Sequence, residues 1–335
     1  MKIHITNVYN MQKAAMLSQH KTTEIAKKMG FLEMGLFCYS TDADNDVELG
    51  KRLDGVLASV QPGDIVFFQS PSWNSLRYDL RFVRKLKVYP GIKLVIFVHD
   101  VIPLMFNSGE ENLRKVIEIY NYADLIIVSS QGMLDLLRKY GLTVKKQMTQ
   151  IVWDYFMDFE VKRPGFFRRM FFSGAPERFP FIDRWIYKTP LILYRDMKQE
   201  NSDLNIEIRG YQPEQKFLSD LSEGGYGLVW ASGEENSYYS LLQPYKVATT
   251  LAAGIPVILQ KGLVPEEIIT KNGLGFVVES LEEADALVQS VTEEEYHKMV
   301  SRIAEFNFLI KGGWFTRKML TDAVMWLLDD NYRPQ

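Results

Sequence analysis

The amino-acid sequence predicts an α/β protein built from two Rossmann-like halves, and three observations support this prediction. The chain has 335 residues, and hydrophobic cores stop growing efficiently below that length, so two domains are expected. Near-continuous apolar runs alternate with helical stretches in both halves, which is typical of parallel sheets covered on both faces. Residues 152–169 are rich in Phe, Asp, Lys and Arg around the breaker Pro164-Gly165, and they indicate an interdomain linker.

The first half contains apolar, strand-like runs separated by helical stretches. Asp64–Gln69 is the clearest of them, because the turn Pro62-Gly63 introduces it. A helix is expected at Lys21–Met29, where apolar residues lie four positions apart. The predicted strands are Lys2–Thr6, Gly35–Tyr39, Asp64–Gln69, Lys93–His99 and Asp124–Ser129.

A second series of strands and helices follows the linker. The helix Tyr245–Ala253 stops at Gly254, and Pro256 begins the next strand, where a missing N–H group costs least. The tail Trp314–Asp330 has one apolar face and predicts a final helix. The predicted strands are Met170–Ser173, Leu191–Tyr194, Ile206–Arg209, Tyr226–Trp230, Ile255–Gln260 and Gly275–Val278.

The composition narrows the class of protein. With 47% hydrophobic residues, 24% charged residues and a net charge of -3, the chain lacks the basic excess of a nucleic-acid binder. The start, Met1–Thr6, indicates a short strand instead of a signal peptide, and no run is long enough for a membrane helix, so we expect a cytoplasmic protein. The single cysteine, Cys38, cannot form an intrachain disulfide; its run Gly35–Tyr39 predicts a buried strand and a core thiol.

Ligands of parallel α/β sheets bind beyond the carboxyl ends of the strands, so residues just after strands are the first candidates. His99 and Asp100 follow one strand of the first half, and Pro103 lies in the loop beyond. The histidine could orient a hydroxyl group or relay a proton, and the carboxylate could accept hydrogen bonds. The alternative is an Asp100 that caps the next helix beside a packed His99, and the residues alone are consistent with both.

Two candidates occur in the second half. Arg178 follows the first strand there and offers a planar fork suited to a diphosphate, unless it pairs with Glu177 or another surface acid. Lys246 lies at the start of the helix that Pro244 precedes, where free N–H groups attract an anion. Lys246 alone would be interpreted as a solvated lysine on an amphipathic helix, but the preceding Ser/Tyr-rich loop and the Gly-Ile-Pro-Val turn beyond favour binding.

Several common motifs are missing from the sequence. It has no P-loop, no Gly-x-Gly-x-x-Gly after the first strand, no Gly-x-Ser-x-Gly elbow, no zinc-type spacing and no Asp-x-Asp motif. These absences favour a mechanism without a metal, in which Arg178, Lys246 and helix N–H groups neutralise a departing diphosphate.

Three segments resemble retaining GT-B glycosyltransferases: Phe97–Pro103, Ala123–Ser130 and Leu251–Val257. The whole chain resembles the bacterial glucosyltransferase 3-like family, whose members extend O-linked N-acetylglucosamine on serine-rich repeat adhesins of streptococci and lactobacilli. The segments that support this likeness run from end to end: Ile5–Asn7, Lys51–Gly55, Pro71–Asn74, His99–Phe106, Pro176–Phe179, Gly225–Trp230, Tyr245–Lys246, Leu251–Val257, Asn272–Gly275 and Phe315–Arg317.

The resemblance implies a GT-B fold, with an acceptor-side domain at 1–155, a nucleotide-sugar-binding domain at 165–312 and a helix at 313–335 that packs back on the first domain. It further implies a central cleft, a UDP-sugar as donor substrate with no cofactor, and a homotetramer. Carried over by position, the predicted donor contacts are Arg178, Tyr211, Pro244, Tyr245, Lys246 and Val247, with the loop around Ala14 approaching from the first domain. His99 and Asp100 would face the sugar or the acceptor and are the catalytic candidates.

The chain departs from the broader retaining GT-B pattern at two positions. That pattern has two glutamates eight positions apart before the Gly-x-Pro turn, and aligning Gly254 with the turn places Leu241 and Thr249 there instead. The two carboxylates that hold the donor sugar and ribose in the broader pattern are therefore absent from these positions.

The predicted reaction is transfer of glucose, or of N-acetylglucosamine, from UDP to an N-acetylglucosamine-modified Ser or Thr, the second step of protein O-glycosylation. Retention of configuration is implied by the resemblance. One alternative is a non-catalytic nucleotide-sugar-binding partner subunit. Another is a galactofuranosyl or polysaccharide-assembly transferase with a membrane-facing patch, for which Phe166–Phe172 is the only candidate; we interpret that segment mainly as linker.

Overall fold

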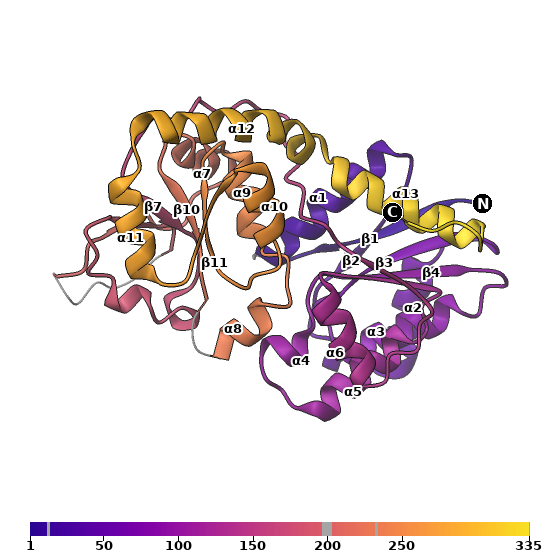
Figure 1. The fold of residues 1–335 in the computed structure, drawn as a ribbon. Helices are drawn as coiled ribbons and strands as arrows, with labels where there is room; N and C mark the ends of the chain where they lie inside the picture. Colours follow the sequence, from indigo (N-terminus) through magenta and orange to yellow (C-terminus); the bar gives the residue numbers. More distant parts are fainter. Residues whose placement is uncertain (12–13, 196–202, 232–233, 335) are drawn as a thin grey trace. The chain divides into compact units, whose positions relative to one another are not determined.

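The computed structural model describes residues 1–11, 14–195, 203–231 and 234–334, and Figure 1 shows its helices and strands. Contacts divide the chain into two compact units. The first comprises residues 1–151 and 315–335, and the second comprises residues 152–314. Each unit contains a parallel sheet of six strands flanked by helices, which confirms the predicted α/β class.

The sheet of the first unit has the strand order β2-β1-β3-β4-β5-β6. The central strands are apolar and fully buried, as the near-continuous hydrophobic runs predict. The strands are β1 (Ile3–Tyr9), β2 (Leu32–Phe37), β3 (Ile65–Ser70), β4 (Lys93–Val98), β5 (Leu125–Val128) and β6 (Lys146–Thr149), and the helices are α1 (Ala14–Lys28), α2 (Asp46–Val56), α3 (Leu76–Leu86), α4 (Ile102–Met105), α5 (Glu110–Tyr120), α6 (Gln131–Lys139) and α13 (Trp314–Leu328).

Serine residues cap two helices of this unit in the loops that follow strands β3 and β5. The Ser75 hydroxyl accepts a hydrogen bond from the Tyr78 N–H group at the start of α3, and the Ser130 hydroxyl accepts one from Met133 at the start of α6. These caps set the chain direction at the carboxyl edge of the sheet. The strand order reverses between β1 and β3, so this edge is where a ligand is expected in an open parallel sheet.

The sheet of the second unit has the strand order β12-β11-β10-β7-β8-β9 and reverses between β7 and β10. Helix α9 packs closely on β10, because a Cβ atom on Gly227 would lie 2.1 Å from the Thr250 hydroxyl oxygen. The strands are β7 (Met170–Phe172), β8 (Leu191–Leu193), β9 (Ile206–Ile208), β10 (Tyr226–Val229), β11 (Val257–Gln260) and β12 (Gly275–Val278), and the helices are α7 (Glu214–Leu221), α8 (Glu234–Tyr239), α9 (Tyr245–Ala252), α10 (Glu266–Asn272), α11 (Leu281–Ser290) and α12 (Glu293–Gly312).

Two expectations about the first sheet need correction. The run at Gly35–Tyr39 is not a buried strand: β2 forms the edge of the sheet, and 60% of the Phe37 side chain is exposed. Cys38 is accordingly half-buried instead of core, and its Sγ donates a hydrogen bond to the Trp73 carbonyl at 3.2 Å. The opposite edge strand, Lys146–Thr149, was not predicted, since a short polar strand carries no apolar pattern.

The segment 152–169 is largely packed into the second unit. Trp153 is buried and donates its indole N–H to the Gln243 carbonyl at 2.7 Å, and Tyr155 is also buried. Within the described part of the chain, no helix is both long and apolar enough to span a membrane.

Candidate functional site

Lys246 lies in an aromatic enclosure at the beginning of α9. Its Nζ donates a hydrogen bond to the Tyr239 hydroxyl oxygen at 2.7 Å. The same Nζ lies 4.9 Å from the ring centroid of Phe179 and 5.3 Å from those of Phe172 and Tyr239. The faces of aromatic rings attract a cation at these distances, so three rings share one ammonium group.

The enclosing rings come from three separate elements of the second unit. Phe172 ends β7, Phe179 follows the short 3₁₀ turn Pro176–Arg178, and Tyr239 ends α8. The Phe172 and Phe179 rings meet edge to face with centroids 5.0 Å apart, and the Phe179 and Tyr239 rings do so at 6.0 Å. Edge-to-face contacts of this kind are the favoured geometry for aromatic pairs, so the rings hold one another in place.

Gly174 makes this arrangement possible. A Cβ atom at that position would lie 2.4 Å from Cε1 of Phe172 and 2.8 Å from Cδ2 of Phe179. Any side chain there would displace the rings around Lys246, so the small residue after β7 is required by the close approach of backbone and ring.

The enclosure adjoins the point where the strand order of the second sheet reverses. A cavity of about 10 Å³, enough for one water molecule, is lined by Phe172 and Ser173 of the β7 end and by Lys246 and Thr250 of α9. This is the position at which open parallel sheets bind ligands.

Arg178 lies beside the same enclosure. Its side chain is half-buried, and its guanidinium carbon is 5.9 Å from the Phe179 ring centroid. The Lys246 Nζ lies 4.9 Å from the same ring. The two residues predicted to bind a diphosphate therefore lie beside one aromatic side chain.

The other members of the predicted segment 244–247 contribute differently. Val247 is 1% exposed, and Pro244 is buried as the N-cap residue of α9. The Tyr245 ring packs against Trp153 and Tyr155, with centroids 5.8 and 5.5 Å apart. The segment therefore positions α9, and within it Lys246 is the side chain that meets the aromatic enclosure.

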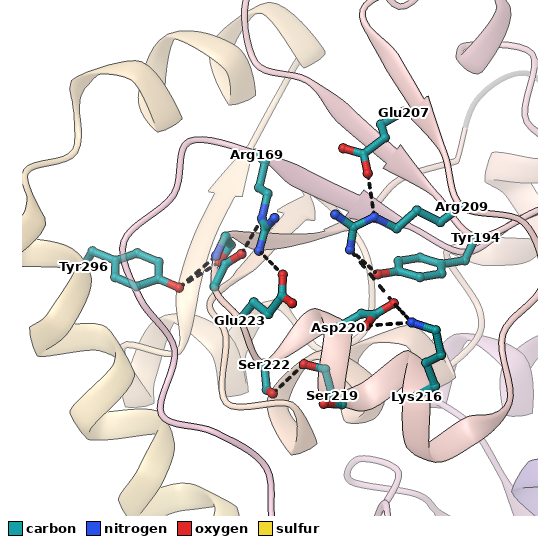
Figure 2. A network of polar contacts seen from close by, with 12 residues as sticks. Arg169, Tyr194, Glu207, Arg209, Lys216, Ser219, Asp220, Ser222, Glu223 and Tyr296 are labelled. Carbon is teal, nitrogen blue, oxygen red and sulfur yellow. Dashed lines mark hydrogen bonds and ion pairs between the residues drawn. The ribbon is translucent and has the colours of Figure 1, made fainter.

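Tyr211 occupies an exposed loop after β9, with 75% of its surface accessible. Figure 2 shows how the chain before it is anchored: the Arg209 guanidinium donates to Glu207 at 2.6 Å and reaches the Tyr194 hydroxyl oxygen at 3.4 Å. Asp220 of α7 lies 3.9 Å from the same guanidinium and also accepts from Lys216. Tyr211 thus extends from a well-anchored strand end, and no contact among the described residues joins it to Lys246.

His99 and Asp100 lie at the carboxyl end of β4 in the first unit. The His99 ring is 6% exposed; its Nδ1 is 3.0 Å from the Ser18 hydroxyl oxygen, and it packs on Phe97 at 4.5 Å. Burial lowers the pKa of His99 to about 3, so the ring is neutral near pH 7. A neutral ring suits hydrogen bonding to a substrate better than carrying a proton. Asp100 does not cap the next helix: Val101 is the N-cap of α4, and Pro103 lies in α4 instead of in a loop.

Three further sequence positions can be placed. Ala14 begins α1, but its side chain is outside what the structure describes. Thr249, one of the two residues at the positions of the expected glutamates, donates its hydroxyl to the Tyr245 carbonyl one turn earlier at 3.1 Å, and Leu241 is half-buried. Among the described residues, no group of three or more His, Cys, Asp or Glu side chains could hold a metal ion.

Sequence reasoning did not identify the aromatic enclosure or Ser18. Phe172 and Phe179 frame the segment that supplied Arg178, and Tyr239 belongs to the Ser/Tyr-rich loop before Lys246, so the signal was present as three aromatic residues flanking two cations. Their convergence depends on sheet topology, which the sequence pattern alone does not resolve.

Residues 2–151 match the glucosyltransferase 3-like N-terminal domain, and residues 170–323 match the C-terminal domain of the same family. Glucosyltransferase 3 of Streptococcus gordonii is 43% identical over 334 residues, covering 98% of this chain and 100% of the relative. Glucosyltransferase 3 of Streptococcus parasanguinis is 40% identical over 332 residues, with coverage of 98% and 100%.

A solved structure shares the fold. HepE from Anabaena, crystallised in complex with UDP and glucose, superposes with a TM-score of 0.65 at 12% sequence identity, covering 97% of this chain and 100% of that chain. Two parallel Rossmann-like sheets, the structural likeness and the two matched domains agree: the fold is of the GT-B type, and the chain belongs to the glucosyltransferase 3-like family.

Proposed function

We propose that this protein transfers glucose from UDP-glucose to N-acetylglucosamine carried on Ser or Thr of a serine-rich repeat adhesin, the second step of that protein's O-glycosylation. N-acetylglucosamine is the alternative donor sugar. The observation that carries the proposal is the identity of 40% or more to two glucosyltransferases 3 over nearly the whole chain.

The charge arrangement of the second unit supports a nucleoside diphosphate as the donor's leaving group. Within the described residues, Lys246 has no carboxylate at ion-pair distance, so none of the described acidic side chains neutralises its positive charge. Arg178 lies at the same aromatic ring, and the N-terminal N–H groups of α9 add partial positive charge. In the proposed reaction these groups stabilise the negative charge that develops on the diphosphate as the glycosidic bond to it breaks.

The proposed mechanism is retaining and requires neither a metal nor a cofactor. The acceptor hydroxyl attacks the anomeric carbon from the side of the departing diphosphate, whose oxygen takes the hydroxyl proton as the sugar–phosphate bond breaks. No protein nucleophile takes part. His99 and Asp100 are proposed to face the sugar or acceptor, with the neutral imidazole orienting a hydroxyl group instead of carrying a proton.

The remaining donor contacts and the setting are part of the same proposal. Tyr211, with its exposed ring, is assigned to the nucleoside. Pro244, Tyr245 and Val247 are assigned to contact with the donor through the backbone at the start of α9. The start of α1 at Ala14 is assigned to contact with the donor from the first domain, where the sequence had suggested a loop. We propose a cytoplasmic homotetramer, in keeping with the family.

Donor turnover tests the proposal. The purified protein is incubated with a panel of UDP-sugars and a Ser/Thr peptide bearing N-acetylglucosamine, and the product mass is measured. A gain of one hexose, abolished in Arg178→Ala and Lys246→Ala but kept in Lys298→Ala, is the expected result. Lys298 is a matched control because it is an exposed lysine of α12 paired with Glu294.

Other outcomes of this experiment would change the proposed activity. A gain of one N-acetylhexosamine would change the donor sugar only. Binding of UDP without a mass gain on any acceptor would favour a non-catalytic partner subunit. Transfer of galactofuranose to a glycan or lipid-linked acceptor would favour a polysaccharide-assembly enzyme. The arginines of the 166–172 segment, the candidate membrane-facing patch, already make hydrogen bonds within the protein: Arg168 donates to the Gln289 and Val291 carbonyls, and Arg169 donates to the Gly224 carbonyl.

A further inference from the structure

We propose that Tyr239, Phe179 and Phe172 are positioning residues that hold the Lys246 ammonium, which pairs with none of the described carboxylates, at the place where the donor's diphosphate binds. This inference rests on the proposed function, because the diphosphate is that of the proposed UDP-sugar. It assigns a role in the reaction to three side chains that do not themselves carry charge.

The reasoning begins with how a lysine can be fixed. A Lys side chain has four rotatable bonds and loses about 2 kcal/mol of rotamer freedom when it is held in one place. A carboxylate partner would fix it but would also neutralise it, and an incoming diphosphate would then have to displace that partner. Aromatic faces attract the ammonium without adding a full negative charge, so the cation is held and remains available to an anion.

The contacts around Lys246 fit this design. One donor is satisfied by the Tyr239 hydroxyl at 2.7 Å, and three ring centroids lie within 5.3 Å of Nζ. An ammonium group has three donors, so further donors remain for phosphate oxygens. Lys246 itself is only half-buried, so part of its surface remains open to solvent.

The local chain is also shaped to maintain the enclosure. The rings are 1%, 3% and 8% exposed at Phe172, Phe179 and Tyr239, and they support one another edge to face. Gly174 provides the space that both phenyl rings occupy. Lys246 is therefore held by a rigid set of rings instead of by a mobile surface partner.

A merely structural role for these rings makes a different prediction from a positioning role. If the rings only fill space, replacing one lowers stability and weakens uridine and UDP binding together. If they position Lys246, the replacement weakens UDP binding but leaves uridine binding unchanged, because uridine has no diphosphate. The ratio of the two dissociation constants is thus the informative quantity.

The experiment measures the binding of UDP and of uridine by calorimetry to the full chain, to Tyr239→Phe and to Phe179→Leu. Each variant is expected to lower the UDP preference over uridine about 3- to 10-fold, the size of one lost hydrogen bond or cation–π contact. Phe166→Leu is the matched control: its ring also meets a cation, Arg168 at 4.7 Å, and packs against Tyr296 of α12 at 5.4 Å, and the UDP preference is expected to stay unchanged.

A double-mutant cycle separates direct from indirect effects. In a Lys246→Ala background, Tyr239→Phe and Phe179→Leu are expected to have no further effect on the UDP preference, since the cation they position is gone. Turnover gives a second readout: kcat is expected to fall more than the KM for the donor rises, because charge on the diphosphate is greatest in the transition state.

Two results would overturn the inference. The first is an unchanged UDP preference in both ring variants while Lys246→Ala lowers it, which would leave the proposed function intact and remove only the positioning role. The second is an equal effect of the ring variants with and without Lys246. If the parent protein binds no UDP at all, the proposed donor is wrong and both proposals fail, so the two failures are distinguishable.

Discussion

The hydroxyl oxygen of Ser18 lies 3.0 Å from Nδ1 of His99, so one hydrogen bond joins α1 to the carboxyl end of β4 inside the first unit. Both side chains are buried, at 6% exposure each. The His99 backbone N–H also donates to the Ser70 carbonyl at 2.8 Å, which continues the pairing of β3 with β4 beyond their ends. The imidazole is thereby oriented by two neighbouring elements of the sheet edge.

Replacing Ser18 with Ala is expected to lower kcat about 2- to 10-fold with little change in the KM for the donor. One neutral hydrogen bond contributes about 0.5–1.5 kcal/mol, and its loss frees the ring to turn away from the acceptor. Steady-state kinetics on the purified variant measure this, with the exposed Ser219→Ala in α7 as control. Wild-type kcat in Ser18→Ala would show that this hydrogen bond does not orient a reacting group.

The buried neutral His99 is expected to make the protein less stable in acid. Its pKa in the fold is about 3, below the ordinary value of 6.5, so between these pH values the unfolded chain binds a proton that the fold excludes. The contribution of the neutral His99 to the free energy of unfolding is fully present above pH 6.5. It is lost as the pH falls toward 3, by up to about 5 kcal/mol. Urea unfolding at several pH values measures this. The free energy of unfolding of His99→Gln should fall less steeply than that of the parent as the pH is lowered from 6.5 toward 3. An identical fall would contradict the neutral state of His99 in the fold.

Asp79 of α3 has the opposite pH dependence. Its carboxylate is buried, accepts a hydrogen bond from the Ser72 hydroxyl, and has a pKa raised by burial to about 7. The unfolded chain releases the proton near pH 4 while the fold keeps it, so stability decreases as the pH rises from about 4 to 7.

Asp79→Asn keeps an acceptor for Ser72 and removes the titrating group. The difference in the free energy of unfolding, variant minus parent, is expected to be larger at pH 8 than at pH 4, by up to about 4 kcal/mol. Chemical denaturation at the two pH values provides the comparison. A constant difference between variant and parent across this range would mean that Asp79 is ionised throughout.

Gly227→Ala is expected to destabilise the second unit by about 1–3 kcal/mol, the usual cost of overpacking a core. The added Cβ would meet the Thr250 side chain, at 2.1 Å from its oxygen. Adding Thr250→Ala should recover part of the loss by making room. Gly50→Ala in α2 is the control: no atom lies within 4 Å of its Cβ position, and removing a helical glycine should raise stability by about 0.5–1 kcal/mol. Thermal unfolding would detect both shifts, and equal effects at the two glycines would refute the packing argument.

Much of the fold could be predicted from local patterns. The buried strands β3, β4 and β5 lie within one residue of the predicted runs, since strands covered on both faces must be apolar at every position. The edge strands of the first sheet are harder to predict. The edge strand β2 alternates between exposed and buried residues, and the four-residue strand β6 has little apolar pattern, so burial was overestimated at Cys38 and Lys146–Thr149 was missed.

The candidate site, too, could be predicted only in part from the sequence. Position after a strand or at a helix start was enough to select Arg178, Lys246 and His99. It did not show that Lys246 is enclosed by rings from β7, from the 3₁₀ turn after it and from α8, or that Ser18 meets His99 from α1. Nor did it show that Tyr245 turns toward Trp153 and away from that enclosure.

The sequence by itself determined the α/β class, the two halves and the family, because hydrophobic periodicity and motif positions are properties of the chain read in order. Only the tertiary structure decided which side chains meet. Phe172 and Tyr239 are 67 positions apart, yet both face one ammonium group because the strand order reverses between β7 and β10. Contacts of that kind depend on how strands are ordered and how side chains pack, and local sequence preference contains neither.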